Sequence, residues 1–373
     1  MKKQIVKEFI TVKKVRYLPP EPEEPPPPPP PPKRWCLAVG SCSLDMITIV
    51  NDRLVPGQVA RTTDGSWRRG GPAANICTVW RRLGMECEFL GVLSRMGAFE
   101  SLRHSFQSDN IEISNCPMTN HHPPHRSIVV QRNTDFRTVL EFADRRQELT
   151  YQQFVGAVDY QKYLWIHFEM RLPDQIRKMI LAVRDFNERC PESKITISTD
   201  VDNMNPDTML AASMADYVFI RKAVMHKYAY VNGRETVCAA REKMVFERKK
   251  YEKSLPPKNP YVLPDELTED ELCQPAESNQ PIITYNNFQD GASCLLKDDT
   301  FLKVAAQTPA KMVDVNGNSD TFAASVIYAL LMVKMSIRDA LEYGARASAL
   351  KVTAEGFDIM RCMPKDLVKC YYA

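Results

Sequence analysis

The sequence has no apolar run long enough to cross a membrane and no large excess of charge of either sign. Its longest apolar run, Thr321 to Val333, is interrupted by Ser325, whereas a membrane-spanning helix needs about 20 apolar residues. The formal net charge is +3, and the first 34 residues carry eight Lys or Arg and four Glu, which leaves about −1 for the rest. We therefore expect a buried core helix at 321–333, no membrane partner and no nucleic-acid partner.

Signals for secretion and for disulfide bonds are also missing. Met1 to Leu18 alternates Lys with apolar residues and lacks the apolar core and cleavage site of a secretory signal. The eleven cysteines are an odd number and contain no C-x-x-C pair. These features predict a cytoplasmic protein with free, mostly buried thiols.

The motifs of several large enzyme classes are absent. The chain has no G-x-x-x-x-G-K-[ST], no H-R-D or D-F-G and no H-E-x-x-H, so P-loop nucleotidases, protein kinases and zinc proteases have no support. The histidines of H-H-P-P-H, at 121, 122 and 125, suggest a metal site. However, the prolines prevent a regular helix and no Cys or carboxylate cluster joins them. We interpret them as a polar loop and assign no metal ligands.

Two segments differ in composition from the rest of the chain. Pro25 to Pro32 is an unbroken proline run, which predicts an extended polyproline II rod of roughly 25 Å at ~3.1 Å per residue. Such a rod can dock an SH3 or WW domain, although a spacer is the simpler interpretation. Lys249 to Gln280 is polar and rich in Pro and Glu, which predicts a mobile surface insertion. We predict a disordered tail over residues 1–34 and one folded domain over residues 35–373.

Short apolar runs alternate with helical patterns along the predicted domain. Strands are predicted at Trp35–Gly40, Phe89–Leu93, Tyr163–Phe168, Ile195–Thr199, Tyr217–Ile220 and Ile282–Thr284. Helices are predicted at Asn75–Leu83, Pro173–Asn187 and Ala223–Arg248. This alternation is typical of an α/β protein whose mostly parallel sheet is covered by helices on both faces. The stretches 46–69 and 126–142 break the alternation and predict a small antiparallel flap beside the main sheet.

The segment V-D-V-N-G-N-S-D-T-F, Val313 to Phe322, carries the clearest chemical signal. Gly317 precedes the predicted buried helix, so the free N–H groups and the dipole of the first turn would face a developing phosphoryl charge. Asp320 lies beside them as a candidate base, because a sugar hydroxyl is a poor nucleophile until a carboxylate takes its proton. The segment therefore predicts phosphoryl transfer to an alcohol.

With G-G-P-A-A-N at 70–75, Asp45 after the first strand and G-N-S-D-T-F at 317–322, the chain resembles ribokinase-like, or PfkB-type, carbohydrate kinases. Further matches follow in the family's order, namely S-L-D-M-I-T-I-V from Ser43, F-R-T-V-L from Phe136, W-I-H-F-E from Trp165 and E-G-F-D from Glu355. The ketohexokinase branch, which converts fructose to fructose 1-phosphate, is the most similar. The resemblance implies a three-layer α/β/α ribokinase-like fold with a small β flap, ATP with Mg²⁺, a small sugar substrate and a homodimer formed through the flap.

The resemblance also implies roles for individual residues. Asp45, Gly71 and Asn75 would line the sugar site, and Asp320 would be the catalytic base. The loop from Gly317 to Asp320 would form the anion hole for the transferred phosphoryl group. The residues that would approach ATP are Arg137, Phe288, Gln289, Asp290, Gly291, Gly317, Asn318 and Ser319.

Departures from the family pattern leave an alternative open. Asn318 and Ser319 replace an Ala and a Gly, and a left-handed Ser319 would cost roughly 1–2 kcal/mol. Pro72 replaces an Asn that helps ketohexokinase bind its ketose, and losing one buried partner costs ~1–3 kcal/mol. Asp45 and Asp320 could also serve only as helix caps. The alternative is a catalytically impaired relative that binds a sugar or a nucleotide as a regulator or scaffold.

Overall fold

The computed structural model describes residues 34–365, apart from 53, 58, 63, 132–136, 143–147, 256–279 and 288. The predicted tail up to residue 33, with its proline rod, therefore lies outside the described residues. Most of the predicted insertion at 249–280 also lies outside them.

The central feature is an eight-stranded sheet in the order β14-β13-β12-β11-β10-β9-β1-β4. Neighbouring strands from β4 to β12 pair in parallel, while β12, β13 and β14 pair antiparallel at one edge. This arrangement confirms the predicted mostly parallel sheet. The strand bounds are β1 Trp35–Val39, β4 Cys87–Leu90, β9 Tyr163–Phe168, β10 Thr196–Val201, β11 Tyr217–Ile220, β12 Ile282–Asn287, β13 Gly291–Leu295 and β14 Phe301–Val304.

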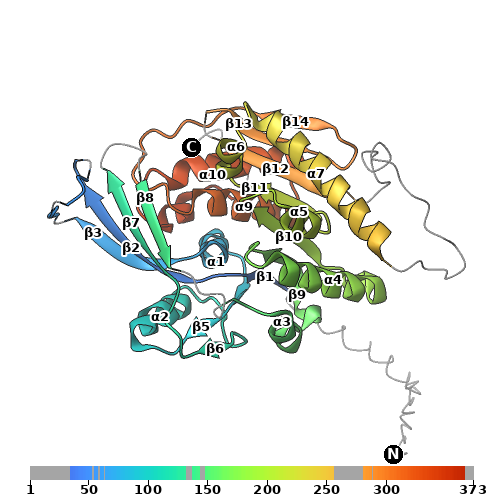
Figure 1. Ribbon diagram of the computed structural model, residues 1–373, viewed down its shortest axis with the longest axis horizontal. Coiled ribbons are helices and arrows are strands. Elements are labelled where there is room, and N and C mark those ends of the chain that lie inside the picture. Colours follow the sequence, from blue (N-terminus) through green and yellow to red (C-terminus); the bar gives the residue numbers. More distant parts are fainter. Residues whose placement is uncertain are drawn as a thin grey trace, which may run out of the picture. The chain divides into compact units, whose positions relative to one another are not determined.

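Helices cover both faces of this sheet, which gives the predicted three layers (Figure 1). Along β1, Cys36 and Ala38 enter one hydrophobic core while Leu37 and Val39 enter the other, because alternate strand residues point to opposite faces. The first core contains α1 Pro72–Leu83, α2 Glu100–Ser108, α9 Asn318–Tyr328 and α10 Ile337–Lys351. The second contains α3 Tyr151–Ala157, α4 Pro173–Arg189, α5 Pro206–Ala212, α6 Lys222–Lys227 and α7 Gly233–Ser254.

The flap is a separate four-stranded sheet in the order β3-β2-β7-β8. Its strands are β2 Ser43–Val50, β3 Gly65–Gly70, β7 His125–Gln131 and β8 Arg137–Phe142. The predicted bounds were close, but β2 and β7 pair in parallel, so the flap is not wholly antiparallel as predicted. The register aligns Arg68, Asp45, Arg126 and Glu141 in one row across the four strands. These four side chains therefore share one face of the flap.

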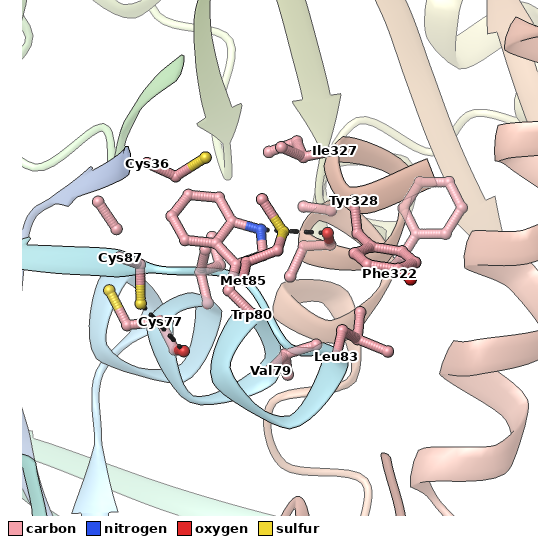
Figure 2. Packing of buried hydrophobic residues seen from close by; sticks show 14 of the residues in the cluster. Cys36, Cys77, Val79, Trp80, Leu83, Met85, Cys87, Phe322, Ile327 and Tyr328 are labelled. Carbon is pink, nitrogen blue, oxygen red and sulfur yellow. Dashed lines mark hydrogen bonds between the residues drawn. The ribbon is translucent and has the colours of Figure 1, made fainter. Parts of the chain in front are cut away.

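Helices α1 and α9 lie side by side in the first core (Figure 2). Trp80 of α1 is fully buried, and its indole Nε1 donates to the carbonyl oxygen of Ala324 in α9 at 3.2 Å. Near the starts of the two helices, Asn75 of α1 contacts Asp320 of α9. The two helices therefore run in the same direction, and their N-terminal ends meet at one edge of the sheet.

Several predicted boundaries were wrong for identifiable reasons. The strand predicted at Phe89–Leu93 breaks at Gly91, where a Cβ atom would lie 2.1 Å from the carbonyl oxygen of Gly40. The helix predicted at 223–248 is divided into α6 and α7, and Ala229 between them has a left-handed φ of 55°. The first six residues of the predicted insertion, 249–254, are the last part of α7.

Two further expectations concern cysteines and membrane spans. All nine cysteines in the described part of the chain carry free thiols, and six of them are buried, as predicted. Among the same residues, no helix combines the length and the apolar character that crossing a bilayer requires.

Candidate active site

A cavity of roughly 200 Å³ opens at the carboxyl ends of β10, β11 and β12, beside the start of α9. Ligands of open α/β sheets commonly bind at this edge, because the strands end there and the following helices begin. The polar lining combines predicted and unpredicted residues, namely Arg137, Asp200, Arg221, Lys222, Asn286, Asn287, Asn318, Ser319 and Asp320.

The first turn of α9 forms one wall of the cavity. Gly317 is the N-cap with a left-handed φ of 78°, and a Cβ atom there would lie 2.4 Å from the ring of Phe357. Ser319 is helical, so the backbone strain expected from the sequence is absent. The Asn318 side chain accepts a hydrogen bond from the Ser348 hydroxyl on α10, which fixes its position. The altered residues thus preserve a helix N-terminus whose first-turn N–H groups lie at the cavity.

Asp320 is almost fully buried and holds two hydrogen bonds from other elements. Its Oδ2 accepts from Nδ2 of Asn75 at 2.7 Å, and its Oδ1 accepts from Nη2 of Arg221 at 2.8 Å. Arg221 is also held by Asp200, to which its Nε donates at 2.7 Å. Burial alone would lower the pKa of Arg221, but the charges of Asp200 and Asp320 raise it well above its usual range. The base candidate therefore has a permanently charged partner.

Asp45 is buried in the flap and is bound by Arg126, its neighbour on the adjacent strand β7. Nε and Nη2 of Arg126 donate to its two oxygens at 2.7 and 2.6 Å, and the Ser43 hydroxyl donates to Oδ1 at 2.9 Å. A Cβ atom on Gly70 would lie 2.2 Å from this carboxylate, so only glycine leaves room for it. Asp45 is not part of the cavity wall next to Asp320. Its role as a sugar ligand stays a prediction.

Gly71 and Pro72 start α1 next to this carboxylate. Gly71 is the N-cap with a φ of 97°, and a Cβ atom there would lie 2.4 Å from the carbonyl oxygen of Ser41. Pro72 takes the first helical turn, where its missing N–H costs no hydrogen bond. Both residues place Asn75 on the first turns of α1, where it contacts Asp320. The sugar-binding roles of Gly71 and Asn75 stay predictions.

The loop before α9 is organised by a buried ion-pair cluster. The Asp314 carboxylate lies 3.0 Å from Nζ of Lys351 and 2.6 Å from Nη2 of Arg68 in the flap. Lys351 is completely buried and also donates to the carbonyl oxygen of Asp314 at 2.7 Å. Burial lowers the pKa of Lys351 to about 8 despite Asp314. From the other outer strand of the flap, Arg137 donates to the side chain of Asn316.

Two buried titratable side chains, His167 and Glu169, lie at the carboxyl end of β9. Glu169 accepts from the backbone N–H of Ser41 at 2.7 Å and from its hydroxyl at 2.9 Å, and burial raises its pKa to about 7. His167 shares a hydrogen bond of 2.9 Å between its Nδ1 and the Ser198 hydroxyl, while burial lowers its pKa to about 4. His167 is therefore neutral near pH 7.

Of the residues predicted from F-Q-D-G, Gln289 and Asp290 lie at the turn between β12 and β13 and Gly291 starts β13, and none of the three lines the cavity. Gly291 has a φ of 84°, and a Cβ atom there would lie 2.2 Å from the carbonyl oxygen of Val304. Asp290 accepts from the N–H of Gly233 at 3.0 Å and pairs with Lys303. Gln289 follows Asn287, which does line the cavity, and Phe288 lies outside the described residues. The nucleotide roles of these residues stay predictions.

Sequence reasoning missed several charged residues of the site, among them Asp200, Arg221 and Arg126. Asp200 and Arg221 lie at the carboxyl ends of β10 and β11, and strand-end position was the signal that could have identified them. Arg126 had no comparable signal, because its pairing with Asp45 depends on the register of two strands far apart in the chain.

Comparisons with known proteins identify the family and the fold. Residues 33–220 and 282–365 match the pfkB family of carbohydrate kinases. Mouse ketohexokinase is 25% identical over 324 residues, which cover 86% of this chain and 97% of that protein. The ribokinase structure from Giardia lamblia has a TM-score of 0.65 at 13% identity and covers 91% of this chain and 99% of its own. The Cryptococcus neoformans ribokinase in complex with ADP has a TM-score of 0.62 at 16% identity, with 91% and 99% covered.

Proposed function

Because this chain belongs to the pfkB family of carbohydrate kinases, we propose that it transfers the γ-phosphoryl group of ATP to a hydroxyl group of a sugar, with Asp320 as the general base. The observation that supports this proposal most directly is the position of Asp320. Its carboxylate is buried at the cavity, in the first turn of a helix whose N-terminus can bind an anion.

In this reaction, different residues of the site would have different roles. Asp320 would take the proton from the attacking hydroxyl, and Asn75 and Arg221 would hold its carboxylate in place through the two hydrogen bonds. The N–H groups at the start of α9 would stabilise charge on the transferred group. Arg137, Asn318 and Ser319, which line the cavity, would approach the phosphates of ATP.

Magnesium would arrive with the nucleotide. Within the described part of the chain, no group of three or more His, Cys, Asp or Glu side chains is placed to hold a metal ion. Mg²⁺ in kinases is bound by one or two carboxylates together with the phosphates of the substrate, and it neutralises charge on those phosphates. Asp200 and Asp320 are the carboxylates at the cavity, and both already accept hydrogen bonds from Arg221, so the phosphates would be the main ligands of the ion.

The similarity to mouse ketohexokinase supports fructose as the acceptor and fructose 1-phosphate as the product. The free thiols of the described cysteines favour a cytoplasmic enzyme. One observation favours the second candidate, a catalytically impaired relative that binds sugar or nucleotide: the carboxylates of Asp45 and Asp320 both accept hydrogen bonds from arginines. A neutral sugar that needs these oxygens must share them or displace a guanidinium group.

Release of ADP by the purified full-length protein separates the two candidates. We expect ATP turnover that depends on added sugar, measured with fructose, ribose and adenosine as acceptors and with a sugar-free control. Nucleotide binding by calorimetry without turnover on any of these acceptors or on charged sugars such as gluconate and fructose 6-phosphate would support the impaired relative and contradict the kinase.

We also infer that the protein forms a homodimer through the outer face of the flap. Met46, Trp67, Leu140 and Phe142 are 39%, 61%, 69% and 44% exposed there, on the face opposite to Asp45 and Arg126. Exposed apolar sheet surfaces of this kind are typical of interfaces.

Sedimentation velocity tests the dimer. The Trp67→Glu, Leu140→Glu double variant is expected to sediment as a monomer, because two buried charges would be left unpaired at the interface. Val231→Glu, at a residue that is 82% exposed outside the flap, is the matched control and should stay dimeric. A wild-type protein that is monomeric at micromolar concentration would contradict the inference.

A further inference from the structure

Arg126 and Arg221 are each bound to a buried aspartate through the same two nitrogen atoms of the guanidinium group. The Nε and Nη2 atoms of Arg126 bind Asp45, and those of Arg221 bind Asp200, so a buried aspartate fixes one edge of each guanidinium group. The Nη1 atoms of both arginines make no hydrogen bond in the part of the chain that the structure describes. The side chains remain 21% and 23% exposed. Each arginine therefore presents a pre-oriented edge with free N–H donors.

Arg221 lies next to Asp320, and Arg126 lies on the inward face of the flap, outside the cavity wall. Arg221 donates to Asp320 and lines the cavity. Arg126 belongs to the inward face of the flap, together with Arg137, which lines the same cavity. Burial lowers the pKa of Arg126, but Asp45 raises it above its usual value and the charge of Asp320 adds to that effect. Arg126 is thus electrostatically coupled to the base as well as to Asp45.

This arrangement suits a negative group better than a neutral hydroxyl. Asp45 already accepts three hydrogen bonds, from Ser43 and twice from Arg126, and a carboxylate has about four acceptor sites. A buried sugar hydroxyl that loses its water needs an acceptor for its proton, and Asp45 has little capacity left to serve as one. A carboxylate or phosphate needs only donors, which a guanidinium group fixed on one edge supplies without losing freedom.

We propose that the acceptor of this kinase carries a carboxylate or phosphate group that binds the free edge of Arg126, with Arg221 on the other side of the reacting hydroxyl. The inference rests on the proposed phosphoryl transfer to a sugar hydroxyl, and in place of fructose it names a sugar acid or a sugar phosphate as the substrate class. In the reaction, a bond forms between the acceptor oxygen and the γ-phosphorus, the bond from that phosphorus to the β,γ-bridging oxygen breaks, and the hydroxyl proton passes to Asp320. ADP is the leaving group.

Matched acceptor pairs test the proposal with the full-length protein. ADP release is measured with gluconate against glucose and with fructose 6-phosphate against fructose. We expect kcat/KM to be about 10- to 150-fold higher for at least one charged member than for its neutral partner, as a charge-assisted hydrogen bond implies. The pair that shows the preference identifies the anion as carboxylate or phosphate.

Arg126→Gln is expected to reduce this charged-to-neutral ratio to about one, and Arg126→Lys to restore part of it. Arg189→Gln removes a surface arginine that is 66% exposed, and it should leave the ratio unchanged. Because Arg126→Gln leaves Asp45 without its main partner, thermal melting checks folding. The Asp45→Asn, Arg126→Gln double variant replaces the ion pair by a neutral hydrogen-bonded pair and should give the same loss of ratio.

The outcomes separate this inference from the proposed function. Equal or faster turnover of the neutral sugars would overturn the inference and leave the kinase intact, since Arg126 would then only neutralise Asp45. A charged-to-neutral ratio that survives in the folded variants would overturn it as well. If no compound is turned over, the proposed function fails. Calorimetry then tests the inference separately, by measuring whether gluconate or fructose 6-phosphate binds to the protein. Binding that Arg126→Gln abolishes supports the anion site, whereas absence of binding overturns it.

Discussion

Asp320→Asn is expected to lower kcat by about 10²- to 10⁴-fold, the usual contribution of a positioned general base. The amide has nearly the same shape as the carboxylate and can still contact Asn75, but it cannot take the proton of the hydroxyl. Arg221 keeps Asp200 as its partner, so the site should remain folded. The measurement is ADP release at saturating ATP and acceptor, together with the Kd for ATP, which should change little.

The matched control for this variant is Asp358→Asn. Asp358 is 82% exposed, pairs with Arg82 and does not line the cavity. Its kcat should equal that of the wild type. If Asp320→Asn retains full kcat while its melting temperature is unchanged, another group must take the proton and the proposed role of Asp320 is wrong.

The second large effect is expected at the buried cluster before α9. Asp314→Ala should lower the free energy of unfolding by about 3–5 kcal/mol, because it leaves the Lys351 ammonium buried without its carboxylate. The Asp314→Ala, Lys351→Met double variant removes the charge as well and should be more stable than the single variant. Urea denaturation measures both. A double variant less stable than the single one would contradict this account of the cluster.

The free energy of unfolding of the same two variants should also depend on pH, and the direction of this dependence can be predicted. The pKa of Lys351 is about 8 in the folded protein, below its ordinary value of 10.5, and loss of Asp314 lowers it further. Between the lowered pKa of Lys351 in the folded single variant and about pH 10.5, Lys351 is therefore protonated in the unfolded chain and deprotonated in the folded one. The stability of the single variant should rise with pH over this range relative to the double variant, which has no such group. A difference between the two variants that does not change from pH 8 to pH 10.5 would show that Lys351 is not the titrating group.

Local patterns were sufficient to predict much of the fold. The bounds of β9 and β11 match the predicted strands because each is a short apolar run buried on both faces of a parallel sheet. The break between α6 and α7 was missed, although Asn232 and Gly233 gave a signal for it. Asn232 caps α7 by accepting a hydrogen bond from the N–H of Glu235.

The site was less predictable than the fold, and the reason is physical. The position of Asp320 follows from sequence alone, since the base and the helix start are three residues apart. The partners of Asp320 come from α1 and from the end of β11, and Arg126 meets Asp45 only through the parallel register of β2 and β7. No local pattern encodes these long-range pairings. The proposal drawn from them replaces fructose, the acceptor expected from the resemblance, by a sugar that carries a charge.

The contact between Trp80 and Ala324 has a consequence for motion. The buried ring of Trp80 joins α1 to α9 (Figure 2), and Asn75 and Asp320 hydrogen-bond to each other between the same two helices, so the two residues belong to one packed block. Their mutual geometry is therefore set when the protein folds and not when a ligand arrives. The flap is tied to this block as well, because Arg69 of β3 donates to the Thr78 hydroxyl of α1 at 2.7 Å, while Arg68 and Arg137 on its two outer strands bind Asp314 and Asn316 in the loop before α9. Any opening of the flap therefore has to break these contacts.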